Sequence, residues 1–371
     1  MACRIGEDLE AEILVRLPAK SLMRFKCVHR SWNALIRRPN FVRRHTRMRS
    51  TGERFMILVE NRDRSPVHWC PCITLLSYDD NDPPQQFEYP FPNEYPSFLT
   101  RIMWHCYCDG ILCLYVANDN SRRDQYIFWN PCTREVKVAY EPEPPFISSN
   151  FALQGFGVDP NTNDFKVVYI PIFQNSNWAV PVLSVKVYNL STDSWTVLDF
   201  HAIPPGTYIT HFGRSQKCNT LVDGVYHWLI SNDGDILCFD FRNDQFSKLK
   251  APVLFRPSLD YIAEVNGSIA YIAEYYDYNN RFRLDIWVMD QHIWSKKYSI
   301  GPLHRPVYNY GIWKDGIPVL GGRHRQPLNP NAHPIRQFQF NTNLYARIRS
   351  VDGYAHLPIH SYKETIAPLS F

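Results

Sequence analysis

The sequence DLEAEILVRLPAKSLMRFKCVHRSW, residues 8–32, determines what the first part of this chain forms. Four of its apolar residues recur at positions i, i+4, i+5 and i+8, which lie on one side of an α-helix. These residues are Leu9, Ile13, Leu14 and Leu17. Acidic residues occupy the early turns, where the helix dipole favours negative charge. The stretch therefore predicts an amphipathic helix that ends at Pro18.

Two further helical segments are expected within the first forty residues. Ser21 can cap the second segment, and the third is expected to stop at Pro39. Their apolar residues at helical spacing are Leu22, Phe25 and Val28 in the second, and Trp32, Leu35 and Ile36 in the third. The sequence thus predicts a small module of three helices.

The chain changes character after about residue 52, where apolar runs become short and rich in β-branched and aromatic residues. Turn residues bound these runs, and Asp-Gly or Asn-Gly pairs begin at residues 109, 223, 266 and 315, which strongly favours tight hairpins. The expected strands include residues 55–59, 111–116, 126–129, 165–170, 182–188, 225–230, 236–241 and 286–289.

The strand-rich part also repeats. A hairpin is followed by a strand that carries an aromatic residue and a polar turn, at a period of roughly 40–60 residues. This is the spacing of four-stranded blades, so a kelch-like β-propeller of roughly six or seven blades is expected. A β-sandwich with a similar number of strands is the alternative.

Charge divides the chain in the same place. Residues 1–50 carry 12 Lys/Arg and 4 Asp/Glu, a formal charge of +8, although the whole chain carries only +4. Residues 51–371 therefore carry −4. Such asymmetry indicates two modules with different partners.

The N-terminus is polar and acidic, unlike a secretory signal, and no apolar run is long enough to span a membrane. We therefore expect the protein in a reducing compartment, either the cytoplasm or the nucleus. In that setting the 10 cysteines are expected to be free thiols.

Residues 8–32 resemble the F-box densely and almost without interruption. F-box modules bind the Skp-family adaptor of cullin–RING ubiquitin ligases, so the resemblance implies this partner. One departure stands just before the match, where the family usually has Leu-Pro and this chain has Ile5-Gly6. Loss of the proline removes a preset φ angle at the helix start and is expected to weaken the first contacts.

Much of the remaining chain is similar to the plant F-box-associated domain. The matching pieces are CDGILCL (108–114), WNPCTRE (129–135), GFGVDPNTNDFKVV (155–168), VYNLSTDSW (187–195) and DGVYHW (223–228). The ending YKETIAPL (362–369) resembles that of S-locus F-box proteins of flowering plants. That subfamily recognises style ribonucleases, the S-RNases, which implies action in the cytosol of the pollen tube during self-incompatibility.

These resemblances divide the chain into an F-box at residues 1–48 and a substrate-binding, propeller-like F-box-associated domain at residues 49–371. An adaptor of this kind holds a substrate near a ubiquitin donor, so no catalytic residue and no cofactor is expected. The residues expected to bind the Skp-family adaptor, or to build the small core beneath that surface, are Leu9, Ile13, Leu14, Leu17, Pro18, Leu22, Phe25 and Trp32.

Two acidic loops are the candidates for the rim that meets a basic substrate, because opposite charge speeds encounter. Their residues are Asp79, Asp80 and Asp82 in one loop, and Glu141 and Glu143 in the other. A solvated loop without a binding role is the alternative for each.

A run of arginines between residues 37 and 49 invites a nucleic-acid interpretation. No nucleic-acid-binding motif accompanies it, so a solvated face of the F-box or a contact with an acidic adaptor surface is expected instead. The paired cysteines at 70/72 and 106/108 lack the usual spacing of zinc ligands, and no metal is expected.

Three other functions stay open. The chain could be an F-box adaptor for a substrate other than an S-RNase, or an F-box scaffold that works outside a ligase. It could also be a sugar-binding or catalytic propeller with a non-functional F-box, since propellers host both activities.

Overall fold

The computed structural model describes most of the chain, and the account below is limited to those parts. They are residues 6–48, 54–62, 69–77, 85–88, 100–118, 124–140, 151–172, 185–198, 202–209, 219–231, 234–252, 259–303, 307–312, 318–322, 360–362 and 365–369. Side chains in the first three strands, and in every strand after residue 303, are not described.

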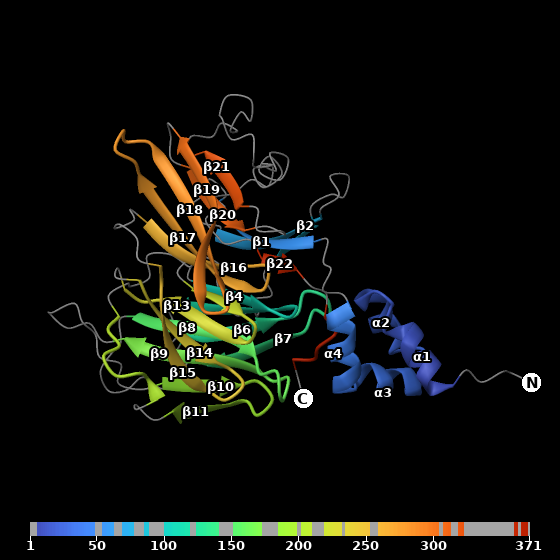
Figure 1. The fold of residues 1–371 in the computed structure, drawn as a ribbon. Coiled ribbons are helices and arrows are strands. Elements are labelled where there is room, and N and C mark those ends of the chain that lie inside the picture. The colour runs from blue at the N-terminus through green and yellow to red at the C-terminus, as the bar shows by residue number, and fades with distance from the viewer. Residues whose placement is uncertain are drawn as a thin grey trace, which may run out of the picture.

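The N-terminal part forms a helical module that lies against one side of a large β-structure (Figure 1). Its helices are α1 (Glu7–Leu14), α2 (Ala19–Phe25), α3 (Arg30–Arg37) and α4 (Pro39–Met48). No membrane-spanning helix occurs among the described residues.

The fourth helix was not predicted. Pro39 ends α3, as expected, but it is also the first residue of α4. Proline suits this position because its fixed φ angle is helical and its missing N–H would have no partner in the first turn. The prediction that Ser21 caps the second helix was wrong. Helix α2 begins at Ala19, and its N-cap is Pro18.

The β-structure consists of antiparallel sheets that follow one another along the chain, with five sheets of four strands and one of two among the described residues. The first sheet has the order β22 (His360–Tyr362), β1 (Arg54–Arg62), β2 (Trp69–Ser77) and β3 (Gln85–Glu88). The second contains β4 (Thr100–Cys108), β5 (Ile111–Asn118), β6 (Gln125–Trp129) and β7 (Val136–Tyr140). The third contains β8 (Phe151–Val158), β9 (Phe165–Ile172), β10 (Val185–Asn189) and β11 (Ser194–Leu198).

The later sheets repeat this order. The fourth contains β12 (Asn219–Val222), β13 (Val225–Leu229), β14 (Asp235–Asp240) and β15 (Gln245–Lys250). The fifth contains β16 (Leu259–Val265), β17 (Ser268–Tyr276), β18 (Phe282–Asp290) and β19 (Ile293–Leu303). A sixth contains β20 (Val307–Ile312) and β21 (Pro318–Gly322). Separate four-stranded sheets in chain order are blades, so the propeller prediction is confirmed and the sandwich alternative is wrong.

The hairpin turns formed where the sequence placed them. Asp109-Gly110, Asp223-Gly224 and Asn266-Gly267 each have two positive φ angles and join neighbouring strands. This is the conformation that matches the twist of a tight hairpin. The fourth pair, at residues 315–316, lies outside the described residues.

A repeated aromatic contact joins successive blades. The indole Nε1 of Trp195, on β11, donates to the carbonyl oxygen of Tyr140 in the preceding sheet at 3.0 Å. Trp294, at the equivalent position on β19, donates in the same way to the carbonyl oxygen of Lys250 at 2.8 Å. The aromatic repeat visible in the sequence therefore marks blade-to-blade contacts.

The main core is shared by the second, third and fourth sheets and contains fully buried aromatic residues such as Tyr126, Phe156, Tyr226 and Phe239. The close packing leaves no space beside Gly157 on β8, where an added Cβ would lie 2.3 Å from the ring of Phe241. Side chains of neighbouring blades are thus in direct contact, and the space between them cannot hold an additional methyl group.

Candidate docking surface and domain junction

Helix α1 presents an apolar stripe to solvent. Leu9 is 55% exposed and Ile13, four residues later on the same side of the helix, is 48% exposed. Pro18 is exposed just beyond the end of this helix. Large apolar side chains exposed together on one side of a helix mark a surface suited to a partner.

The polar side of α1 explains why the stripe faces outward. The indole Nε1 of Trp32, on α3, donates to Oε2 of Glu10 at 3.0 Å, and Arg38 pairs with Glu7 at 2.8 Å. Glu12 accepts from Arg44 on α4, and this contact holds the pKa of its carboxyl below the ordinary value. Three acidic residues of α1, Glu7, Glu10 and Glu12, are thus tied to α3 and α4, and Leu9 and Ile13 stay exposed to solvent.

The other predicted docking residues are divided by burial. Leu14 and Leu22 lie in the core of the helical module, where they are 3% and 0% exposed. Leu17, Phe25 and Trp32 are half-buried at its edge, and the rings of Phe25 and Trp32 lie 5.4 Å apart. Leu14 and Leu22 therefore build the module, and the exposed and half-buried members are the ones positioned to meet a partner.

The unusual start of α1 is visible as well. Gly6 is the N-cap residue, and it has no side chain that could accept a hydrogen bond from the first turn. Its carbonyl oxygen accepts from the backbone N–H groups of Leu9 and Glu10. Ile5 lies outside the described residues. The helix starts on backbone bonds and on the favourable charge of Glu7, Asp8 and Glu10 alone.

A short C-terminal segment, residues 365–369, joins the helices to the propeller. Ile366 is 1% exposed and belongs to the core of the helical module. Ala367 and Leu369 belong instead to the core of the propeller. Neighbouring residues of one extended segment thus complete two different cores, and Figure 1 shows the segment beside α4 and β7.

Asn130, fully buried in the turn between β6 and β7, holds this segment. Its side-chain nitrogen donates to the carbonyl oxygens of Thr365 and Ala367, at 3.2 and 3.0 Å. Its Oδ1 accepts from the backbone N–H groups of Cys132 and Thr133, which closes the turn. All the hydrogen-bonding capacity of this buried amide is therefore used.

Two further contacts fasten the same segment, and a charged residue at the end of α2 lies near one of them. The backbone N–H of Leu369 donates to Oε2 of Glu135 at 2.9 Å, and the hydroxyl groups of Thr46 and Thr365 lie 3.0 Å apart. Burial lowers the pKa of Lys26, at the end of α2, although the Glu135 carboxylate opposes this effect. The helical module, the turn and the C-terminal segment form one continuous junction.

Sequence reasoning missed this junction. The ending of the chain carries a family resemblance, and in it the apolar residues Ile366 and Leu369 follow the polar stretch 362–365. That contrast is a signal of burial, but it does not say which core receives each residue.

The structure does not test the acidic residues predicted to form the rim that meets the substrate, so their role stays a prediction. Asp79, Asp80, Asp82, Glu141 and Glu143 all lie outside the described residues.

The residues considered for other chemistry have structural environments. Cys106 and Cys108 are buried on β4, and burial raises the pKa of Cys106 to about 12, so its thiol stays protonated. A histidine, the residue type most often used for proton transfer, is likewise buried on β13: burial lowers the pKa of His227 to about 4. No group of three metal-ligating side chains gathers within the described parts of the chain.

Two family models match the chain. The model described as the F-box associated beta propeller domain matches residues 70–309, and the F-box domain model matches residues 3–44. Among solved structures, the beta-propeller domain of the Trilobed protease from Pyrococcus furiosus is similar to 61% of this chain and 64% of its own, at 10% identity and a TM-score of 0.36.

Relatives in Arabidopsis thaliana share both parts. A putative F-box/kelch-repeat protein is 29% identical over 311 residues, which cover 81% of this chain and 77% of the relative. A putative F-box protein is 26% identical over 316 residues and 82% of each chain. An F-box/kelch-repeat protein is 26% identical over 333 residues and 84% of each chain.

Proposed function

This chain belongs to the family of the F-box-associated beta propeller domain, and on that premise we propose that it is the substrate-recognition subunit of a Skp–cullin–F-box ubiquitin ligase. The helical module binds the Skp-family adaptor and the propeller binds the substrate. The chain itself needs no catalytic group, because ubiquitin transfer is accelerated by holding the substrate close to the donor. Both partners meet it in the cytosol or the nucleus.

The observation that carries this proposal is the exposed stripe of α1. Leu9 and Ile13 are large, apolar and about half exposed, although Leu14, the residue after Ile13, is buried in the core of the module. A module of this size has a small hydrophobic core, so its large apolar residues are expected to be buried in it. Their exposure is accounted for if the adaptor covers them, with Pro18 and the half-buried Leu17, Phe25 and Trp32 at the edges of the contact.

The double variant Leu9→Ala/Ile13→Ala is expected to bind a Skp-family adaptor at least ~30-fold more weakly than the wild-type chain, because truncating apolar anchors at the centre of an interface typically costs about 2 kcal/mol or more. Isothermal titration calorimetry measures this affinity directly. Since both side chains are exposed in the free chain, the thermal midpoint of unfolding should change little.

A matched control removes two exposed apolar side chains from the propeller. Val197 and Ile293 are 68% and 69% exposed, and Val197→Ala/Ile293→Ala should leave adaptor affinity unchanged. A folded wild-type chain that does not bind the adaptor would overturn the ligase proposal and favour a propeller that works without its F-box.

We further propose that the substrate is a style S-RNase, and that the protein marks non-self forms for degradation in the pollen tube. Two features support this. The ending at residues 362–369 resembles that of S-locus F-box proteins, and residues 51–371 carry a net charge of −4, which suits a basic partner.

Surface plasmon resonance with purified S-RNases tests this substrate. Non-self S-RNases are expected to bind the chain more tightly than the self form, and more tightly than lysozyme, a basic protein of unrelated fold. Equal binding of lysozyme and S-RNases would reduce the interaction to general charge attraction. Adaptor binding without any S-RNase binding would leave the ligase role and discard this substrate.

A further inference from the structure

Helix α4 carries two arginines, Arg43 and Arg47, that take no part in the contacts described above. The face opposite them is fixed, because Phe41 is buried in the helical core and the side chain of His45 lies 2.9 Å from the carbonyl oxygen of Leu17. Thr46 is buried against Thr365. The helix cannot rotate, so its outward residues have a defined direction.

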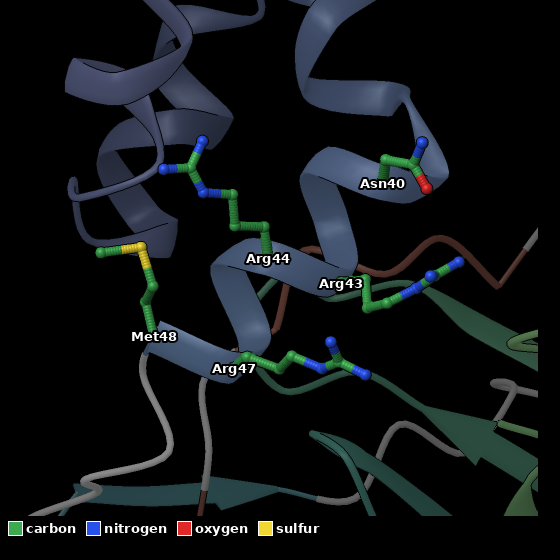
Figure 2. A pocket seen from close by; sticks show the side chains of 5 residues that line it. All are labelled: Asn40, Arg43, Arg44, Arg47 and Met48. Carbon is green, nitrogen blue, oxygen red and sulfur yellow. The ribbon is translucent and has the colours of Figure 1, made fainter.

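The outward face is strongly basic and hollowed. A cavity of about 430 Å³ runs along it, which is within the range of small-molecule sites. The described residues that line it are Asn40, Arg43, Arg44, Arg47 and Met48, spaced one helical turn apart. Figure 2 shows that Arg43 and Arg47 extend to one side of α4 and Arg44 to the other.

The arginines of this part of the chain differ in their partners. Arg38 and Arg44 pair with Glu7 and Glu12 of α1. Among the described residues, no carboxylate forms an ion pair with Arg43 or Arg47. Two of the arginines that the sequence had grouped together are thus neutralised within the module, and two are not.

The environment of Arg43 indicates an absent acceptor. Its Nε is buried and has no hydrogen-bond partner in the described structure. A buried donor of a charged group without an acceptor is costly. Like charges four residues apart also disfavour the helix. An anion between Arg43 and Arg47 would remove both costs.

We propose that Asn40, Arg43 and Arg47 form a binding site for a small, multiply charged phosphate anion. Guanidinium groups present planar pairs of N–H donors that match phosphate oxygens. The Cβ atoms of residues four apart on a helix lie roughly 5–6 Å from one another, so two linked phosphoryl groups can each meet one arginine. Asn40 adds an amide donor one turn earlier, and no described carboxylate lines the cavity.

The test uses the full chain, with inorganic tripolyphosphate as the probe and sodium sulfate at equal ionic strength as the reference. Tripolyphosphate is expected to bind saturably and to raise the thermal midpoint. In Arg43→Gln/Arg47→Gln the affinity should fall at least ~30-fold, since two sets of charge-assisted hydrogen bonds are lost. The charge-matched control Arg24→Gln/Arg30→Gln, at exposed positions of α2 and α3, should bind within ~2-fold of wild type.

A second variant keeps the charge and the fold. Arg43→Lys/Arg47→Lys should bind more weakly than wild type and more tightly than the glutamine variant, because lysine lacks the planar fork. Adaptor affinity, set by the other side of the module, should be equal in the wild-type chain and in both α4 variants.

Three outcomes would overturn the proposal. One is the absence of saturable binding to the wild-type chain, and another is equal loss in the two glutamine variants, which would show general screening. The third is an acidic peptide without phosphate that binds more tightly than tripolyphosphate through the same arginines. That result would assign the face to a protein partner.

Discussion

The variant Asn130→Asp is expected to lose about 3–5 kcal/mol of unfolding free energy at pH 7, a large loss for a change of one atom. The new carboxylate keeps the oxygen that accepts from Cys132 and Thr133, so the turn still closes. It replaces the donor, however, with an oxygen that faces the carbonyl oxygens of Thr365 and Ala367 in a fully buried site. Thermal and urea unfolding measure the loss.

The same substitution at Asn161 is the control for this prediction. Asn161 is exposed, and among the described residues its side chain donates to the carbonyl oxygen of Arg242, at 3.1 Å. Asn161→Asp should cost less than about 0.5 kcal/mol, as surface changes usually do. Hydrogen exchange at residues 365–369 should accelerate in Asn130→Asp alone. Comparable losses in the two variants would show that Asn130 does not hold the C-terminal segment.

The variant Lys166→Met is expected to lose about 3–5 kcal/mol, because removal of one partner leaves a buried charge uncompensated. The Nζ of Lys166 lies 3.2 Å from Oδ2 of Asp159 and 3.0 Å from Oδ1 of Asp244 on the next blade. The side chains of Lys166 and Asp159 are only 9% and 6% exposed. Methionine fills a similar volume, so the loss reports the charge and not a cavity.

The loss should depend on pH in a defined direction. Burial raises the pKa of Asp159, but the backbone N–H of Asn161 and the ammonium group of Lys166 outweigh it and hold the pKa below its ordinary value. A lowered carboxyl pKa adds stability above the unfolded value of about 3.9, and that stability disappears as the pH falls through the folded value. The difference between wild type and Lys166→Met should therefore be constant from about pH 5 to 8 and shrink below about pH 4.

An exposed pair provides the comparison. Lys250 lies 3.0 Å from Asp235, at the same distance as Lys166 from Asp244, but its side chain is 57% exposed. Lys250→Met should cost about 0–1 kcal/mol, since water screens exposed pairs. Equal losses of unfolding free energy in Lys166→Met and Lys250→Met would show that burial of the first ion pair does not contribute to stability.

Much of the propeller was predictable because each blade is specified locally. The Asp-Gly and Asn-Gly turns fix hairpins whose two central residues need positive φ angles. After two of the polar turns an aromatic residue makes a contact between blades, as Trp195 and Trp294 show. Local turn chemistry and repetition therefore predicted the architecture without any knowledge of distant contacts.

The helical module was predictable in part. Periodicity placed the first three helices but assigned Leu9, Ile13 and Leu14 to one stripe, whereas Leu14 points into the core and the other two point outward. The spacing of the apolar residues does not show which residues of the stripe are buried in the module and which are exposed to solvent. That choice was made by the pairs between the acidic residues of α1 and the later helices, which join positions more than 20 residues apart.

Similar turns can also serve different contacts. NPCTRE, from Asn130, and DPNTND, from Asp159, form turns with the same backbone bonds. The first residue of each closes its own turn with one oxygen, and its second polar atom binds a partner outside the turn. For Asn130 that partner is the C-terminal segment, and for Asp159 it is Lys166. The turns are visible in the sequence, but the partner of each second polar atom is not.

The place of Ile366 in the helical core affects the order in which the protein can mature on the ribosome. The helices are synthesised first, yet one of their core residues emerges only after the whole propeller has been translated. A module this small has little core to hold it together meanwhile. A messenger that stops early thus yields chains with every helix of the docking module and an incomplete core beneath it. Under the function proposed above, such shortened chains are expected to bind the adaptor more weakly than the full chain does.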